Sequence, residues 1–285
     1  MYYGLITIAV VMFGACFSMQ DVYRRMRGSG LRTSLESSFW GGVAGLAVLL
    51  IVNGFRLSFT PFTLLIALLA ALNSIAFVFC SIKALDTINL SLFSLFSMLG
   101  GMLLPFLQGL IFFQERLNAA KILCLILITS ALCLTVTRSD KKKGTIYYAG
   151  VFLLNGMSGV LSKIFTSAPY AKGSSADYSI WIAILTAILA GSALLLHRSG
   201  ERKRYTAHAL AVVNLRGSLN QLANYFLIIA LAHVDTSVQY PLVTGGVMIV
   251  STLLCLLDKR KPSKKEMASV ALAFLGMLAL FAIPI

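Results

Sequence analysis

The feature that most constrains this chain is a series of apolar stretches, each about 20 residues long, the length a helix needs to cross the hydrocarbon core of a bilayer. Ten such stretches follow one another with short connections, at residues 2–20, 36–54, 61–82, 90–113, 119–137, 146–166, 178–197, 207–232, 237–257 and 266–284. Charged residues make up only 12% of the chain, against about 25% in soluble domains. The sequence therefore predicts an all-α integral membrane protein with ten transmembrane helices, whose first partner is the lipid bilayer.

The distribution of Lys and Arg predicts the orientation in the membrane. Eighteen of the 24 basic residues fall in the odd-numbered connections, and three (Arg56, Arg116 and Lys172) fall in the even-numbered ones. Cytoplasmic loops carry the excess of Lys and Arg. We therefore expect a multi-pass protein of the cell (cytoplasmic) membrane with both termini outside and the basic loops in the cytoplasm. Since this pattern accounts for the net charge of +14, we expect no nucleic-acid partner.

The two halves of the chain resemble each other at a shift of 145 residues. The matching pairs are Tyr2-Tyr3 with Tyr147-Tyr148, Gly14 with Gly159, and Gly100-Gly101 with Gly245-Gly246. Because a repeat of five helices has an odd number of spans, the second copy would enter the membrane inverted, as in many transporters with a central binding site. We predict two inverted five-helix repeats, residues 1–138 and 145–285, around a central cavity, with a basic cytoplasmic linker at 139–144.

The ends of both halves resemble the EamA-like domain of the drug/metabolite transporter superfamily. The first half ends in SLFSLFSMLGGMLLPFLQGLIFFQERLNAAKILCLILITSALCL (91–134) and the second in YPLVTGGVMIVSTLLCLLDKRKPSKKEMASVALAFLGMLAL (240–280). Gln114-Glu115-Arg116-Leu117 matches the Glu-Arg-Leu-type turn of that domain, whereas the second half has Arg260-Lys261-Pro262 and keeps Gly276. The resemblance implies a ten-helix carrier of small metabolites, often exported. Family members commonly have both termini in the cytoplasm, and the charge pattern here predicts the opposite.

One predicted span carries an unusual polar sector. In the stretch NLRGSLNQLANY (214–225), a turn of 100° per residue places polar side chains on one side and leucines on the other. These polar residues are Asn214, Arg216, Ser218, Asn220, Gln221, Asn224 and Tyr225. Polar groups at mid-bilayer mark substrate pathways, so we predict that this face lines the cavity. The alternative is interhelical hydrogen bonding, which is worth about 0.6–2 kcal/mol for each bond.

Other spans contribute further candidates. Polar or aromatic residues near mid-span that could line the cavity are Asn73, Ser74, Asn155, Ser158 and Trp40, although Trp40 also suits packing inside the bundle. Small residues let helices approach closely, and prolines let them bend. We assign packing or gating to Gly41, Gly45, Gly100, Gly101, Gly245, Gly246, Pro105 and Pro241, with static packing as the alternative.

The chain lacks the patterns that an enzyme would need at membrane depth. No carboxylate lies deep in a predicted span, and paired catalytic groups, metal-ligand spacings and a phosphate-binding glycine loop are absent. We therefore expect no enzyme activity, no cofactor and no metal site. Arg216 is the one formal charge expected deep in the bundle, which favours a zwitterion or an organic anion.

The function we predict is secondary active or facilitative transport of a small polar metabolite, such as an amino acid, by alternating access. Export is favoured over import. A proton is the coupling ion to test, and the sequence does not indicate an oligomeric state. The alternative is a non-transporting membrane receptor or scaffold subunit that keeps a transporter-like fold.

Overall fold

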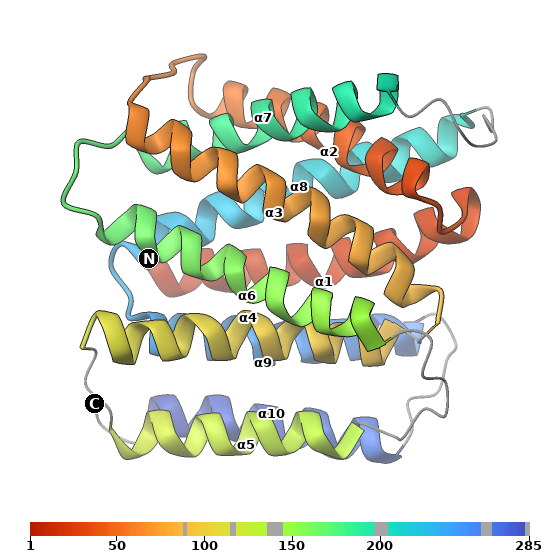
Figure 1. Ribbon diagram of the computed structural model, residues 1–285. Helices are drawn as coiled ribbons and strands as arrows, with labels where there is room; N and C mark the ends of the chain where they lie inside the picture. Colours follow the sequence, from red (N-terminus) through yellow and green to blue (C-terminus); the bar gives the residue numbers. More distant parts are fainter. Residues whose placement is uncertain (88–89, 115–117, 136–144, 197–204, 258–263, 283–285) are drawn as a thin grey trace.

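Helices make up nearly all of the described chain. The structure, a computed structural model, describes residues 1–87, 90–114, 118–135, 145–196, 205–257 and 264–282 (Figure 1). Its elements are α1 (Tyr2–Arg27), α2 (Leu31–Val52), α3 (Pro61–Leu85), α4 (Leu90–Phe112), α5 (Ala119–Thr135), α6 (Thr145–Ser167), α7 (Ser175–Leu196), α8 (Ala207–Leu231), α9 (Thr236–Leu257) and α10 (Lys264–Ala282). The predicted linker at 139–144, the turn at 115–117 and the segment 260–262 lie outside the described residues.

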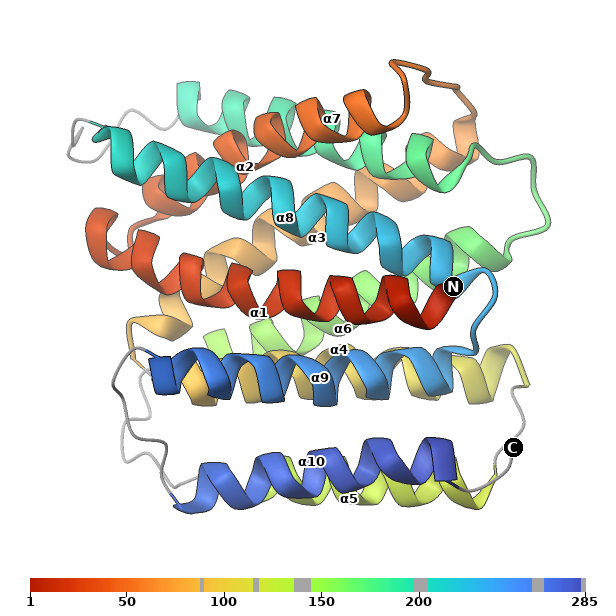
Figure 2. The ribbon, with the colours of Figure 1, turned by 180° about the vertical axis from the view of Figure 1, so that it is seen from behind.

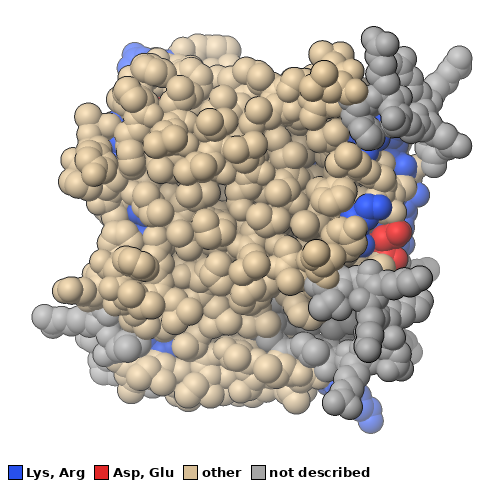
Figure 3. Space-filling view, viewed as in Figure 1, with Lys and Arg blue, Asp and Glu red and all other residues tan. Residues whose placement is uncertain are grey.

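Several helices could cross a membrane. By length and composition, α1, α2, α3, α6 and α7 are long and apolar enough. On the face drawn in Figure 3, charged side chains gather toward the two ends of the helices, and the broad band between them carries apolar and neutral residues. Among the described residues, α8 does not meet the same hydropathy criterion, although it has 25 residues, because its polar sector lowers the mean hydropathy. The predicted helical membrane architecture is confirmed at this level.

Charged turns extend two helices beyond their apolar stretches. Helix α1 continues to Arg27 instead of ending near residue 20, and Asp21 pairs with Arg24 and Arg25 at distances of 2.9 and 2.5 Å. Helix α2 begins at Leu31, not at 36, and its first turns carry the Arg32–Glu36 pair at 3.1 Å. Such pairs at i, i+3 and i, i+4 stabilise helical turns. Hydropathy alone misses them because they lie beyond the apolar run.

Short polar caps fix the starts of other helices. The hydroxyl of Thr60 accepts a hydrogen bond from the Thr63 amide at the start of α3, and Pro61 occupies the first helical position. The hydroxyl of Thr206 accepts one from the Ala209 amide at the start of α8. These hydroxyls satisfy amides that have no partner within the helix.

The helices lie side by side along one common direction (Figures 1 and 2). Helix α1 packs against α8 and α9, and α6 packs against α3 and α4. Helix α2 packs against α7 and α8, whereas α5 and α10 pair with each other at one edge. The start of α1 and the end of α10 lie at the same end of the bundle, here called the terminal end. The opposite end, where α1 ends at Arg27, is called the basic end.

Glycines stand where backbones come close together. A Cβ on Gly41 of α2 would lie 3.4 Å from the Gly217 Cα of α8, and one on Gly45 would meet the side chain of Gln221. A Cβ on Gly100 would overlap the backbone of Phe152 in α6. The other predicted packing residues occupy helix interfaces as well: Gly101 faces Asn155, Gly246 faces Val10, and Gly245, Pro105 and Pro241 are buried.

Candidate functional site

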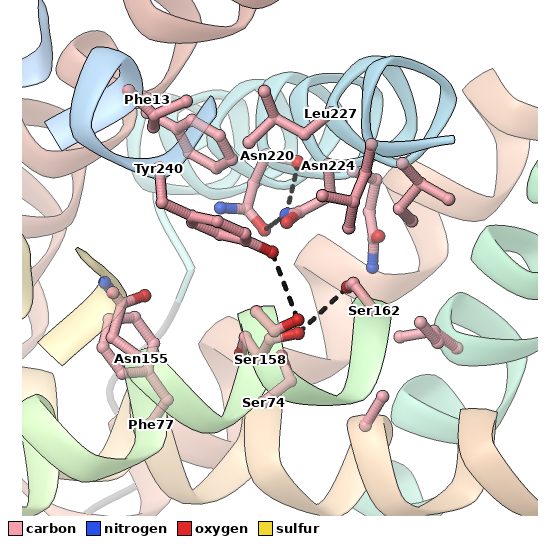
Figure 4. Close-up of a pocket in the computed structure, with 18 of the residues that line it drawn as sticks. Phe13, Ser74, Phe77, Asn155, Ser158, Ser162, Asn220, Asn224, Leu227 and Tyr240 are labelled. Carbon is pink, nitrogen blue, oxygen red and sulfur yellow. Dashed lines mark hydrogen bonds between the residues drawn. The ribbon is translucent and has the colours of Figure 1, made fainter. Parts of the chain in front are cut away.

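A cavity of about 150 Å³ lies among seven of the helices (Figure 4). Its walls come from α1, α3, α4, α6, α7, α8 and α9. The polar lining residues are Ser74, Asn155, Ser158, Ser162, Tyr178, Ser179, Asn220, Gln221, Asn224, Gln239, Tyr240 and Thr244. Six of the predicted cavity residues are thus brought together here: Ser74, Asn155, Ser158, Asn220, Gln221 and Asn224. The predicted packing residue Gly101 also lines the cavity.

The cavity reaches from the middle of the bundle toward the terminal end. It is lined by Tyr178, three residues after the start of α7, by Leu231 at the end of α8, and by Gln239 near the start of α9. These helix ends lie at the terminal end of the bundle. The cavity is therefore displaced from the basic end.

The wall formed by α6 is held by a chain of hydrogen bonds. Asn155 donates from Nδ2 to the Ser97 carbonyl of α4 at 2.6 Å. Ser162 donates from Oγ to the Ser158 carbonyl at 2.9 Å (Figure 4). The candidate Asn73 lies behind this wall, since its Nδ2 donates to Ser158 Oγ at 2.9 Å and it is not a lining residue. Asn73 therefore positions a lining hydroxyl.

The wall formed by α8 presents amides at helical spacing. Asn224 donates from Nδ2 to the Asn220 carbonyl at 2.8 Å and to its Oδ1 at 3.2 Å. Within the described chain, the side-chain amide of Gln221 makes no hydrogen bond. Its donor and acceptor are therefore available to a bound molecule.

Helix α9 contributes residues that the sequence reasoning missed. Tyr240 donates from its hydroxyl to the Gly159 carbonyl at 3.2 Å (Figure 4). Gln239 donates from Nε2 to the Leu227 carbonyl at 2.9 Å, and its Oε1 is buried with no partner in the described residues. The available signal was the pair of polar residues just before Pro241 in an otherwise apolar stretch. Tyrosine near a predicted helix end is more typical of the membrane interface.

The lining of the cavity carries no formal charge in the part of the chain that the structure describes. Its amides and hydroxyls both donate and accept hydrogen bonds. Such a site suits an uncharged polar molecule or a zwitterion, whose opposite charges cancel. No group of three His, Cys, Asp or Glu residues that could hold a metal ion occurs among the described residues.

The remaining candidates on α8 and α2 lie away from the cavity. Tyr225 packs beside an apolar cluster with Leu46 and Ile184, and the Trp40 ring lies edge-on to Tyr205 with centroids 6.1 Å apart. Three further polar residues of α8 are half-buried but do not line the cavity: Asn214, Arg216 and Ser218. The reason is depth, because here the backbone of α8 lies against Cys16 of α1 and Gly41 of α2.

Comparisons with known proteins reveal a shared fold. The sequence matches no protein-family model, and it matches no curated protein. Among solved structures, the fold is similar to one described as "Crystal structure of protein", with a TM-score of 0.69 and 18% sequence identity over 96% of this chain and 98% of that chain. At this identity the likeness concerns the fold alone, and it extends over nearly the whole length of both chains.

Proposed function

We propose that the protein is a secondary transporter, active or facilitative, that moves a small polar metabolite such as an amino acid by alternating access. One observation carries the proposal: seven helices enclose an uncharged cavity lined by amides and hydroxyls inside an apolar bundle. Polar groups buried without partners are unfavourable. Amides placed at such a position in a membrane protein therefore indicate contact with water or a bound polar solute.

The proposal includes ten membrane spans in two inverted repeats, and equivalent helix contacts support it. Gly101 faces Asn155, and at a shift of 145 residues the same contact recurs between Gly246 and Val10. Gly159 faces Pro105, which corresponds to Gly14 facing Val250. The packing of α6 on α3 and α4 likewise corresponds to that of α1 on α8 and α9. Such contacts are expected if two copies of one unit pack about a pseudo-two-fold axis.

The size of the cavity favours a metabolite over a multi-ring drug. Its volume is about 150 Å³. Pockets for drug-sized ligands begin at about 300 Å³. The neutral lining favours a solute with no net charge, and the resemblance to EamA-like carriers favours export.

Alternating access requires that one end of the pathway be closed while the other end is open to the solute. The cavity extends toward the terminal end, whereas at the basic end ion pairs connect α1 with α2 and with the end of α3: Arg27–Glu36 at 2.6 Å and Arg24–Asp86 at 3.3 Å. If the predicted orientation holds, the cavity faces the outside and these ion pairs hold the cytoplasmic end together.

The test uses purified protein in liposomes with a panel of radiolabelled amino acids and organic acids. We expect at least one zwitterion to move across the membrane and to raise the melting temperature. Asn220→Leu and Gln221→Leu should each abolish or strongly weaken both effects, because leucine cannot replace the amide hydrogen bonds. Ser130→Leu provides the control, since Ser130 is exposed on α5, which does not line the cavity. A folded protein that neither binds nor moves any member of the panel would refute the proposal.

A further inference from the structure

Arg216 lies beside the helix contact at the basic side of the cavity. It precedes Gly217, whose backbone meets Gly41 of α2. Helical side chains lean toward the amino end of their helix, which for α8 is the basic end. Its Nη2 atom would be 3.3 Å from a Cβ placed on Gly41, so the absence of a side chain at position 41 leaves room for the guanidinium.

A stripe of α1 faces this part of α8. Cys16 donates from Sγ to the Arg216 carbonyl at 3.4 Å, and Tyr23 packs with Ala209 and Val213 one to two turns toward the basic end. Gln20 follows Cys16 by four residues and precedes Tyr23 by three, so it lies on the same stripe between them. The interface thus brings together a guanidinium, a carboxamide and a phenol.

The polar atoms of this interface lack partners in the described residues. Gln20 is only 3% exposed, and both of its amide atoms are buried without a hydrogen bond. The Tyr23 hydroxyl and Arg216 Nε are also buried without a hydrogen bond in the described residues, and the Tyr23 phenol lies beside the Arg27–Glu36 pair as well. The nearest acids on α1 and α2 are already engaged: Asp21 pairs with Arg24 and Arg25, and Glu36 pairs with Arg27 and Arg32. Within the described part of the chain, no carboxylate forms an ion pair with Arg216. A half-buried charge and buried donors without partners are costly unless a ligand supplies them.

We propose that Arg216, together with Gln20 and Tyr23, is an oxyanion-binding site, separate from the neutral cavity, that takes the carboxylate of the transported metabolite when the basic end opens. This inference rests on the proposed transport function and extends it by naming the substrate group. A guanidinium binds a carboxylate with two parallel N–H···O bonds. The Gln20 amide and the Tyr23 hydroxyl can each donate one more. The neutral cavity then holds the rest of the solute at the other side of the Gly41–Gly217 contact.

Cys16 provides a native reporter for this site. In a variant that keeps Cys16 as its only thiol, we compare its modification by an anionic and a cationic methanethiosulfonate reagent in liposomes during transport. The measured quantity is the ratio of the modification rates by the anionic and the cationic reagent. A nearby positive charge should make this ratio at Cys16 about tenfold higher than at a position with no charge nearby. The reference is Ser74→Cys in a Cys16→Ser background, because Ser74 lines the uncharged cavity. Arg216→Gln should bring the ratio at Cys16 to the reference value, and Arg216→Lys should keep it high.

The outcomes separate this inference from the function on which it rests. A ratio at Cys16 that equals the reference, or that Arg216→Gln leaves unchanged, overturns the oxyanion site. Labelling of Ser74→Cys without labelling of Cys16 also overturns it and leaves the cavity proposal standing, whereas failure of both positions to react refutes the transport proposal. Protection of Cys16 by acetate assigns the site to carboxylates. Protection by inorganic phosphate alone overturns that assignment.

Discussion

Gly217 of α8 lies against the backbone of Gly41 of α2, so closely that a Cβ on Gly217 would overlap the Cα, carbonyl carbon and carbonyl oxygen of Gly41. The relationship is asymmetric. A Cβ on Gly41 would be 3.4 Å from the Gly217 Cα, and its nearest neighbour would be the end of the flexible Arg216 side chain at 3.3 Å. This contact joins the two helices on the basic side of the cavity, where the proposed transport cycle must open.

The asymmetry predicts different effects of two alanine substitutions. Gly217→Ala must push α8 away from α2, and overpacking of this kind destabilises by about 1–3 kcal/mol. Gly41→Ala requires only a small movement of Arg216 and should have a much smaller effect. Melting temperatures in detergent, followed by loss of the monodisperse chromatographic peak, provide the measurement. Equal melting temperatures for the two variants would contradict the packing described here.

The ion pairs at the basic end should differ in strength because they differ in burial. Arg27 and Glu36 lie 2.6 Å apart with both side chains 6% exposed, so Glu36→Gln removes a buried carboxylate that pairs with a buried cation. Removal of one partner of a buried pair costs about 3–5 kcal/mol. Arg25 pairs with Asp21 but is 46% exposed, and Arg25→Gln should cost less than about 1 kcal/mol. Unfolding in mixed micelles with increasing SDS would measure both, and a comparable loss in the two variants would argue against the buried pair.

The pair between α5 and α9 predicts an asymmetry of another kind. Lys121 is 2% exposed and lies 3.1 Å from Asp235, which is 57% exposed. Asp235→Asn removes a carboxylate that pairs with a buried cation, whereas Lys121→Met removes the cation and leaves an acid in contact with water. We expect Asp235→Asn to lower the melting temperature more than Lys121→Met does. The reverse order, measured under the same detergent conditions, would show that the packing of the lysine stem outweighs its charge.

The positions of the helices could be predicted from the sequence because each lies in an apolar run about as long as a membrane-spanning helix. For α3 and α8 the predicted starts agree with the structure, since hydropathy rises where the threonine caps stand. The ends of α1 and the start of α2 could not be predicted this way. Their final turns are held by pairs such as Asp21–Arg24 and Arg32–Glu36, which a hydropathy criterion assigns to the loop.

The candidate site could be predicted only in part, because the sequence of a helix gives the direction of each side chain but not which neighbour it meets at each depth. Asn220, Gln221 and Asn224 line the cavity. Arg216 and Ser218 come before Asn220, nearer the basic end, where Gly41 of α2 meets Gly217 and Cys16 of α1 meets the Arg216 backbone. The angular position of Arg216 on α8 was therefore insufficient to place it in the cavity.

This difference in depth leads to a prediction about access of water along α8. Gln221 lines the cavity, whereas Ser218 does not, although both belong to the same polar sector of the helix. In a cysteine-free background, Gln221→Cys should react with a membrane-impermeant maleimide from the side of the terminal end. Ser218→Cys should react at least about tenfold more slowly, as expected for a thiol without direct access to water.

Addition of a transported solute should protect Gln221→Cys, because the solute occupies the space in front of it. Leu215→Cys supplies the control for a residue that faces outward, since Leu215 is 51% exposed at the surface of the bundle. It should not be protected by solute. If Gln221→Cys reacts from neither side of the membrane, α8 does not border an aqueous cavity, and its amides instead hold neighbouring helices together.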